Sequence, residues 1–227
     1  MLLWTGNLIF LLSVPISTMN PLVAIFGFVV QTLLYTGLFI TAHDAMHSSV
    51  YRRNRRINDL IGRIAVTLYA LFSYRRLVTK HARHHKYPAS PEDPDYHDGE
   101  HSGFLAWYTR FMLNYIRIPQ ILGMAVVFNL LLHLVGVNVW NIVLFWVSPA
   151  LLSTVQLFYF GTFLPHREPD GGYTNRHRAE TNAYPVFLSF LTCYHFGYHW
   201  EHHEFPGVSW WRLPAKRREV SDTTYAE

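Results

Sequence analysis

Charge is absent from two long stretches of this 227-residue chain. Residues 1–43 and 118–165 contain no Asp, Glu, Lys or Arg, and both are rich in Leu, Val, Ile and Phe. Uncharged apolar stretches of this length are typical of helices that cross a membrane. The sequence therefore predicts an integral membrane protein rather than a soluble domain with a large core.

Cysteine is almost absent as well, because Cys193 is the only one. The chain can form no internal disulfide, and it has no cysteine cluster that could bind zinc or an iron–sulfur centre. It also lacks a nucleophile motif, a Gly-rich phosphate loop and a dinucleotide fingerprint. We therefore expect Cys193 to be a small apolar packing residue, and any redox chemistry to need a bound metal and electrons from a partner.

Basic residues are confined to part of the chain. All 19 Lys and Arg lie between Arg52 and Arg218, and none lies in the uncharged stretches. A formal net charge of +4 could indicate a nucleic-acid partner. The placement instead follows the pattern of a membrane protein whose basic side faces the cytoplasm, so we expect no nucleic-acid partner.

The uncharged stretches divide into four apolar segments, at residues 2–14, 22–42, 118–135 and 140–164. The first is short, but no basic region precedes it and no small-residue cleavage site follows it, so we expect a retained helix rather than a signal peptide. Residues 22–42 are long enough to cross a hydrocarbon core of about 30 Å. We predict an all-α fold with about four transmembrane helices in two hairpins, with turns at residues 17–21 and 136–139.

The segments between and beside the hairpins are more polar. Residues 57–78 are partly apolar but interrupted by charge, so we expect them to lie at the membrane interface or to dip in without crossing. Prolines exclude a regular helix from a loop at residues 87–103. Residues 104–117 are aromatic and end in arginine, which predicts an interfacial helix. Without internal repeats or a linker, residues 1–227 are predicted to form a single domain.

Histidine is abundant, and most of the 14 histidines fall into three boxes. The boxes read HxxxH, HxxHH, and an HxxxH merged with an HxxHH. Residues three or four apart share one face of a helix, so each box would present its imidazoles in one direction. Neutral imidazole is the commonest metal ligand, and we interpret the boxes as a metal site. The box residues are His43 and His47; His81, His84 and His85; and His195, His199, His202 and His203.

Metal-binding boxes that act together must end on the same side of the membrane. Two hairpins achieve this and place His43, His81, His166 and His199 on the side that carries every Lys and Arg, which should be the cytoplasm. The boxes offer nine imidazoles and His166 a tenth. That number suffices for two metals with four or five ligands each, whereas one zinc needs three or four. Imidazole binds iron, copper and zinc, so the ligand type leaves the metal open.

The three boxes between uncharged spans resemble those of the membrane-bound di-iron desaturases and hydroxylases. Four further stretches are similar to the bacterial and cyanobacterial β-carotene ketolase family, along nearly the whole chain. The chain departs from that family in a short N-terminus and in Ser209, which precedes a tryptophan pair where proline is expected. The four stretches are TAHDAMH at residues 41–47, DPDYH at 93–97, FYFGTFLPHR at 158–167 and WWRLP at 210–214.

The resemblance implies two iron ions, held almost wholly by histidine, as the cofactor. Asp44, beside the first box, would accept a hydrogen bond and so orient an imidazole, or would only cap its helix. The implied metal ligands are His43, His47, His81, His84, His85, His166, His195, His199, His202 and His203.

The resemblance also implies the reaction. O2 and external electrons would introduce a keto group at C4 of β-ionone rings, converting β-carotene through echinenone to canthaxanthin, or zeaxanthin toward astaxanthin. The carotenoid would lie in the bilayer against the aromatic residues at 158–163, and a ferredoxin with its reductase would supply electrons. The protein would lie in the inner membrane with its site on the cytoplasmic side.

Other functions remain open on the boxes alone. A carotenoid ring hydroxylase or a fatty-acyl desaturase would carry the same histidines. A histidine-rich metal transporter would instead place ligands within its spans, where this chain has only His133. We expect His133 to be a packed polar residue and His177 to lie on the surface. His97 and His101 have a structural role in the proline-rich loop or bind metal, and the family match at residues 95–97 also leaves His97 facing a ligand or the substrate.

Overall fold

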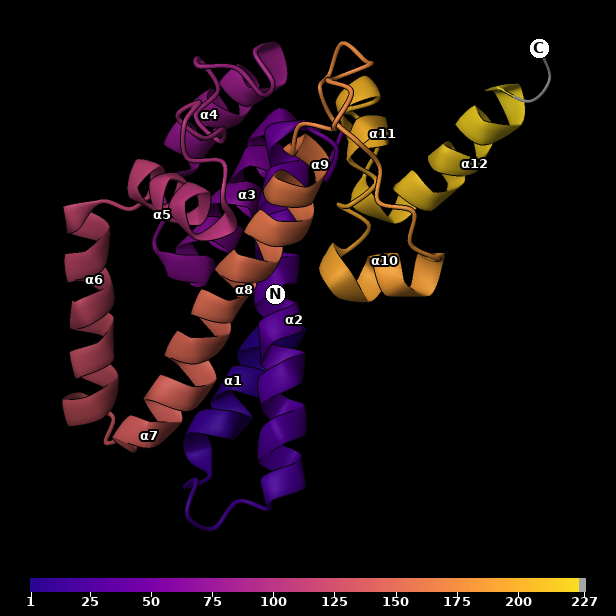
Figure 1. Cartoon of the computed structure of the whole chain (residues 1–227). Coiled ribbons are helices and arrows are strands. Elements are labelled where there is room, and N and C mark those ends of the chain that lie inside the picture. Colours follow the sequence, from indigo (N-terminus) through magenta and orange to yellow (C-terminus); the bar gives the residue numbers. More distant parts are fainter. Residues whose placement is uncertain (225–227) are drawn as a thin grey trace.

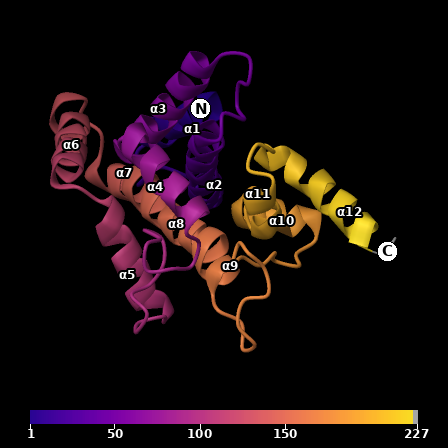
Figure 2. The same cartoon turned by 90° about the horizontal axis from the view of Figure 1, so that it is seen from above.

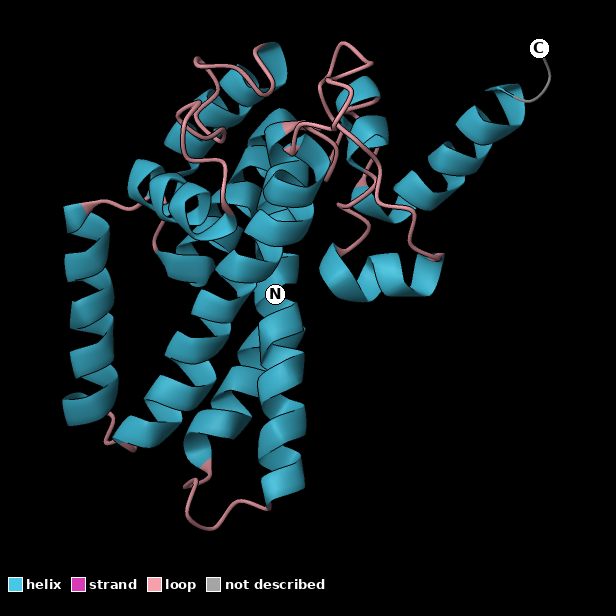
Figure 3. Cartoon of the chain, in the orientation of Figure 1, coloured by secondary structure: helices cyan, strands magenta, loops and turns pink. Residues whose placement is uncertain are grey.

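The computed structural model describes residues 1–224, which form helices joined by loops, with no strand in that range (Figure 3). The predicted all-α class is confirmed. Short π segments η1 (Leu130–Leu134), η2 (Val143–Val147) and η3 (Tyr159–Phe163) interrupt the α-helices, and η4 (Trp210–Arg212) is a 3-10 turn. The α-helices are α1 (Leu2–Ser13), α2 (Pro21–Met46), α3 (Arg55–Ala70), α4 (Tyr74–Lys86), α5 (Phe104–Tyr115), α6 (Ile118–Asn129), α7 (Val139–Ile142), α8 (Ser148–Phe158), α9 (Leu164–His166), α10 (Val186–Cys193), α11 (His199–Glu204) and α12 (Leu213–Thr224).

Helix α2 is the central element, and it packs against α1, α3 and α8. Its start is defined locally, because the Asn20 side chain accepts a hydrogen bond from the Leu22 amide and proline occupies the first turn. Buried polar groups along α2 find partners on neighbouring helices: Asn7 donates to Gln31 at 2.8 Å, and Thr36 donates to Gln156 at 2.6 Å. Such contacts satisfy polar side chains where water is excluded.

The second long helix runs without a break from Val139 to His166, through α7, η2, α8, η3 and α9. Two π segments widen it locally, and proline enters at 149 and 165. A π segment rotates the following residues relative to a regular helix and is frequent near functional sites. This helix ends at His166. Its last part, α9, lies at the same end of the fold as the C-terminal end of α2 (Figures 1 and 2).

Two helices are long and apolar enough to cross a membrane, α2 and the Val139–His166 helix. A bent pair, α5 with α6 and η1, would count as a third, but its two parts meet at 86°. Helix α1 has 12 residues, too few for a full span. The turns that join α1 to α2 and α6 to α7 lie at the same end of the molecule, opposite α4, α9 and α11 (Figure 1).

The more polar segments, residues 57–117, match the predicted structure only in part. Residues 57–78 do not form one helix, because Leu71 adopts a left-handed conformation that ends α3 before α4 begins. The loop at 87–103 has no helix, as its prolines predict, and residues 104–115 form α5. Helix α10 was not anticipated; it runs across the direction of α2 (Figure 1) and exposes Val186, Phe187, Leu188 and Leu191. An exposed apolar helix beside the spans is typical of the membrane interface.

Candidate metal centre

Four helices bring the histidines together at one end of the fold. The end of α2, the last turns of α4, the end of α9 and all of α11 meet there, although they are far apart in the sequence (Figures 1 and 2). The last turn of α4 and the short α11 each place two adjacent histidines at the meeting point. Local helix spacing presents the imidazoles, and tertiary packing makes them converge.

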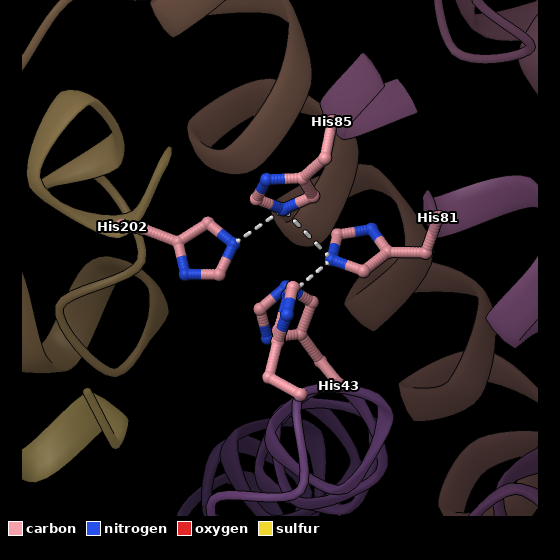
Figure 4. A group of neighbouring side chains, drawn as sticks. His43, His81, His85 and His202 are labelled. Carbon is pink, nitrogen blue, oxygen red and sulfur yellow. Dashed lines mark hydrogen bonds between the residues drawn. The ribbon is translucent and has the colours of Figure 1, made fainter. Parts of the chain in front are cut away.

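One group contains five histidines, each of which offers one ring nitrogen, and these five nitrogens all lie within 4.8 Å of one another. The Nε2 atoms of His47 and His81 are 2.6 Å apart, those of His81 and His85 are 3.1 Å apart, and those of His85 and His202 are 3.0 Å apart. The rings turn toward a common point, as Figure 4 shows for four of them. The members are His43, His47, His81, His85 and His202.

A second group contains four buried histidines, His84, His166, His199 and His203, again with ring nitrogens within 4.8 Å. The Nε2 atom of His199 lies 2.9 Å from that of His166 and 3.1 Å from that of His203. The His203 Nε2 is also 3.1 Å from that of His84. The two groups adjoin, because the rings of His85 and His203 stack with centroids 4.2 Å apart.

In two rings of the second group, a hydrogen bond at Nδ1 shows that Nε2 is the nitrogen facing the group. The Nδ1 atom of His166 lies 2.8 Å from the Arg178 carbonyl oxygen, and that of His199 lies 3.3 Å from the Phe196 carbonyl oxygen. A carbonyl can only accept, so Nδ1 carries the proton and the neutral ring has a bare lone pair at Nε2. The lone pairs of His166 and His199 thus face each other at 2.9 Å, an arrangement that a cation between them would stabilise.

The spacing of the nitrogens also fits metal ligands. Two nitrogens bound about 2.1 Å from one ion lie about 3.0 Å apart at right angles and about 3.4 Å apart in a tetrahedron. Five of the six close Nε2 pairs are 2.9 to 3.1 Å apart, and the sixth is 2.6 Å. The separations match neighbouring ligands at right angles better than a tetrahedral site. Both groups therefore fit a bound metal ion.

Burial keeps most of these imidazoles in the form that binds metal. Desolvation, reinforced by the neighbouring imidazoles, lowers the pKa of His81, His202 and His203 well below the ordinary value. Neutral rings are therefore present at neutral pH. His84 differs: burial lowers its pKa, but the adjacent Asp93 carboxylate outweighs this and raises the pKa above the ordinary value.

Asp93 is a residue whose role was not recognised from the sequence. Its two carboxylate oxygens lie 3.0 and 2.9 Å from Nδ1 of His84, and both groups are buried. The carboxylate also accepts hydrogen bonds from the Ala89 and Asp95 amides, which hold it in place. A carboxylate behind a metal-binding histidine orients the ring and raises its basicity. The sequence signal was the DPDYH stretch at residues 93–97, which is similar to the ketolase family but indicates no role for Asp93 by itself.

Asp95 is a second carboxylate near His84, and it also lines the apolar pocket. Its Oδ2 lies 3.7 Å from Nδ1 of His84, and its Oδ1 accepts a short hydrogen bond from the Tyr115 hydroxyl. The Trp107 indole donates to the Asp95 carbonyl oxygen at 2.7 Å, which anchors the loop on α5. Burial raises the pKa of Asp95 to about 6. The proline-rich loop therefore forms one wall of the centre.

Asp44 lies where the sequence placed it, beside His43 at the end of α2. Its Oδ2 accepts a hydrogen bond from the Trp210 amide at 3.0 Å. Its Oδ1 is 3.6 Å from Nδ1 of His43, which is too long for a hydrogen bond. Within the described residues, neither ring nitrogen of His43 has a hydrogen-bond partner. Asp44 thus connects the Trp210 segment to the first histidine box.

His195 is the one predicted ligand that the structure does not bring to either group. The expected helix through residues 194–203 does not form, because Tyr194 and His195 both have positive φ, and α11 begins only at His199. The helical i, i+4 pairing of His195 with His199 is therefore lost. The His195 ring instead stacks on Tyr198 and Trp210, at centroid distances of 5.8 and 6.2 Å.

The remaining histidines lie outside both groups. His97 packs on Tyr96 and Trp107, His101 pairs with Asp98, and His133 is exposed on η1 rather than packed. His177, which was expected on the surface, lies near the four-histidine group. Its Nε2 lies 2.7 Å from Glu204, and its ring centroid is 5.7 Å from that of His203.

An apolar pocket opens onto the centre. It encloses about 770 Å³ of empty space, part of it open to the surroundings. Its walls include two histidines from each group, and aromatic and aliphatic side chains form most of the rest. Asp95 and Tyr115 are its polar exceptions on the loop side. The histidine members are His43, His81, His84 and His199.

Gly161 allows the Phe196 ring to pack closely against the helix at the wall of this pocket. A Cβ atom at this position would lie 2.4 Å from Cδ1 of Phe196, whose ring is 4.5 Å from that of His43 and 4.9 Å from that of His199. Gly161→Ala is therefore expected to displace Phe196 against both groups. A misplacement of this kind costs about tenfold to a hundredfold in rate. Product formation per unit of membrane-inserted protein measures the effect, and unchanged product formation would contradict it.

The sequence pattern of the fatty acid desaturase family matches residues 19–130 and 114–227. The zeaxanthin 4-ketolase of Chlamydomonas reinhardtii is 46% identical over 189 residues, which cover 82% of this chain and 42% of that protein. The β-carotene 4-ketolase 3 of Haematococcus lacustris is 42% identical over 84% of this chain and 61% of its own length. This chain thus spans about half the length of these two relatives.

A bacterial relative is matched over more of its length. The β-carotene ketolase of Paracoccus sp. (strain N81106 / MBIC 01143) is 42% identical over 199 residues, which cover 87% of this chain and 81% of that protein. No solved structure matches. The predicted family resemblance is confirmed, and the chain is similar to carotenoid ketolases. It belongs to the fatty acid desaturase family.

Proposed function

We propose that this chain is a carotenoid 4-ketolase that uses O2 and external electrons. The observation that carries the proposal is the apolar pocket whose walls include histidines of both groups. An apolar substrate in this pocket would meet the metal site directly. The names of the relatives, ketolases of β-carotene and zeaxanthin, supply the substrate class.

Two iron ions are the proposed cofactor. The five-histidine group would hold one, and His84, His166, His199 and His203 the other. His195 is left out because it lies in neither group. When bound, the iron pair would supply the activation of O2 and the oxidation of an unactivated C–H bond. Nitrogen separations near those of right-angled ligands support iron over tetrahedral zinc.

The protein residues position the ring and keep the site dry. Phe39, Phe111 and Leu157 line the apolar part of the pocket and exclude water from the reacting carbon. His84 is held by Asp93, and His166 by the Arg178 carbonyl, so the ligands are preorganised. Hydroxylation of the same ring methylene twice gives a geminal diol, which loses water to leave a ketone at C4.

We also propose the membrane arrangement. One domain, residues 1–227, would place two hairpins in the bilayer, the first from α1 and α2 and the second from α6 and the Val139–His166 helix. The turns of both hairpins lie at one end and the histidine helices at the other, which supports this arrangement (Figure 1). All Lys and Arg lie outside the uncharged stretches. By the positive-inside rule the histidine side would face the cytoplasm, with the chain in the inner membrane.

Expression of the chain in cells that accumulate β-carotene tests the activity. Echinenone and canthaxanthin are expected on pigment chromatography, and their absence from cells carrying the empty vector is the control. Zeaxanthin would instead indicate a ring hydroxylase. Unchanged pigment together with new unsaturated acyl chains would indicate a desaturase. Either of these results would contradict the ketolase proposal.

A further inference from the structure

A hollow on the surface is lined by a residue, Ser49, that is hydrogen-bonded to Asp44. Ser49 and Ser209 contribute to its walls. The Ser49 amide and hydroxyl both donate to the Asp44 carbonyl oxygen, at 3.0 and 2.9 Å, and the Ser209 hydroxyl donates to the Ser49 carbonyl oxygen at 3.2 Å. The hollow therefore rests on the end of α2 that carries the first histidine box.

The walls of the hollow carry cationic and aromatic side chains. Arg52, Arg53 and Arg212 line it together with Trp211, which is 52% exposed, and no acidic residue from the described part of the chain is among its walls. The Arg52 side chain donates to the Gly207 carbonyl oxygen, which joins the two segments that form the hollow. Trp and Arg are the residues most enriched at the centres of protein interfaces.

A continuous set of contacts leads from this surface to the histidine centre. The Trp211 ring lies 5.7 Å from the Trp210 ring, measured between centroids. The Trp210 amide donates to Oδ2 of Asp44 at 3.0 Å, and Oδ1 of Asp44 is 3.6 Å from Nδ1 of His43. His43 belongs to the five-histidine group. An electron carrier seated on Trp211 would thus be separated from the centre by two tryptophans and one carboxylate.

We propose that the hollow lined by Arg52, Arg53, Trp211 and Arg212 is the docking surface for an acidic one-electron carrier protein. This inference rests on the proposed oxygenase function. Each hydroxylation consumes one O2, two electrons and two protons, adds one oxygen atom to the ring carbon and releases the other as water. Two reduced carriers are therefore oxidised per hydroxylation. A carrier with an acidic surface complements the three arginines and gains a fast, steered association.

The test uses the full chain in detergent and a plant-type [2Fe–2S] ferredoxin as the probe. The double variant Arg53→Glu with Arg212→Glu is expected to weaken ferredoxin binding, measured by calorimetry, at least tenfold. Trp211→Ala is expected to weaken it as well. The double variant Arg75→Glu with Arg76→Glu, at two exposed arginines on α4, makes the same charge change and should leave binding unchanged. Salt should weaken binding of the unmodified protein more than that of the double variant.

Turnover distinguishes docking from other roles. With dithionite and methyl viologen as a small reductant, the double variant should form keto product at the rate of the unmodified protein, while ferredoxin-supported turnover should show a raised KM for ferredoxin. Unchanged ferredoxin binding in the double variant would overturn the docking surface. If the variant instead loses association with anionic vesicles, the arginines contact lipid headgroups. Failure of the unmodified protein to form keto product with the small reductant would refute the ketolase proposal separately.

Discussion

Replacing His202 with alanine is expected to abolish keto-carotenoid formation and to reduce bound iron from two ions per chain toward one. His202 closes one side of the five-histidine group, with its Nε2 3.0 Å from that of His85. Its removal leaves an incomplete ligand set around that metal, whereas the four-histidine group keeps all its members. Elemental analysis of the purified protein and pigment chromatography of the expressing cells measure the two effects.

His195→Ala is the matched control for this experiment. His195 lies in the same stretch of sequence and is also buried, but its ring belongs to neither group. The variant should keep both iron ions even if the lost packing on Trp210 lowers its stability. Membrane insertion of both variants should match that of the unmodified chain. Full activity in the His202 variant, or loss of iron in the His195 variant alone, would contradict the ligand assignment.

Asp93→Asn is expected to weaken iron binding or activity about tenfold to a hundredfold without removing any ligand. The carboxylate holds Nδ1 of His84 at 2.9 Å and increases the basicity of that ring. An amide of the same shape is uncharged and supports the ring less. Iron retained during titration with a chelator measures the affinity.

Glu92→Gln provides the corresponding control. Glu92 is the exposed neighbour of Asp93 in the same loop, and its carboxylate accepts only from Ser90 among the hydrogen bonds of the described residues. The same charge is removed, so a general electrostatic effect would appear in both variants. Equal loss of iron from both, or from neither, would show that the contact between Asp93 and His84 does not support the centre.

The boxes were recognisable in the sequence because their information is local. HxxxH and HxxHH place imidazoles on one helical face wherever a helix forms, and residues 81–85 and 199–203 are helical, while His47 of the first box directly follows the end of α2. The prediction that His195 is a ligand assumed that a helix continues from residue 195 to residue 199, and no helix forms there. Tyr194 and His195 take left-handed conformations, with φ of 50° and 63°, and no glycine at these two positions signalled the break.

The division of the histidines between two groups was not predictable from spacing. Adjacent residues on a helix point in different directions, so His84 and His85 go to different groups, as do His202 and His203. Each group is assembled from at least three segments separated by dozens of residues. Asp93 was missed for the same reason: its contact with His84 depends on how the proline-rich loop folds back over α4.

Local sequence patterns suffice to predict the helical class, the uncharged segments that suit a membrane, and the histidine boxes, because each depends on residues within a few turns of one another. The packing of the helices sets which nitrogens converge, which carboxylate supports them, and where the apolar pocket and the arginine-lined hollow lie. These features depend on the angles and distances between α2, α4, α9 and α11. Such relations arise from the packing of distant side chains, which no local pattern records.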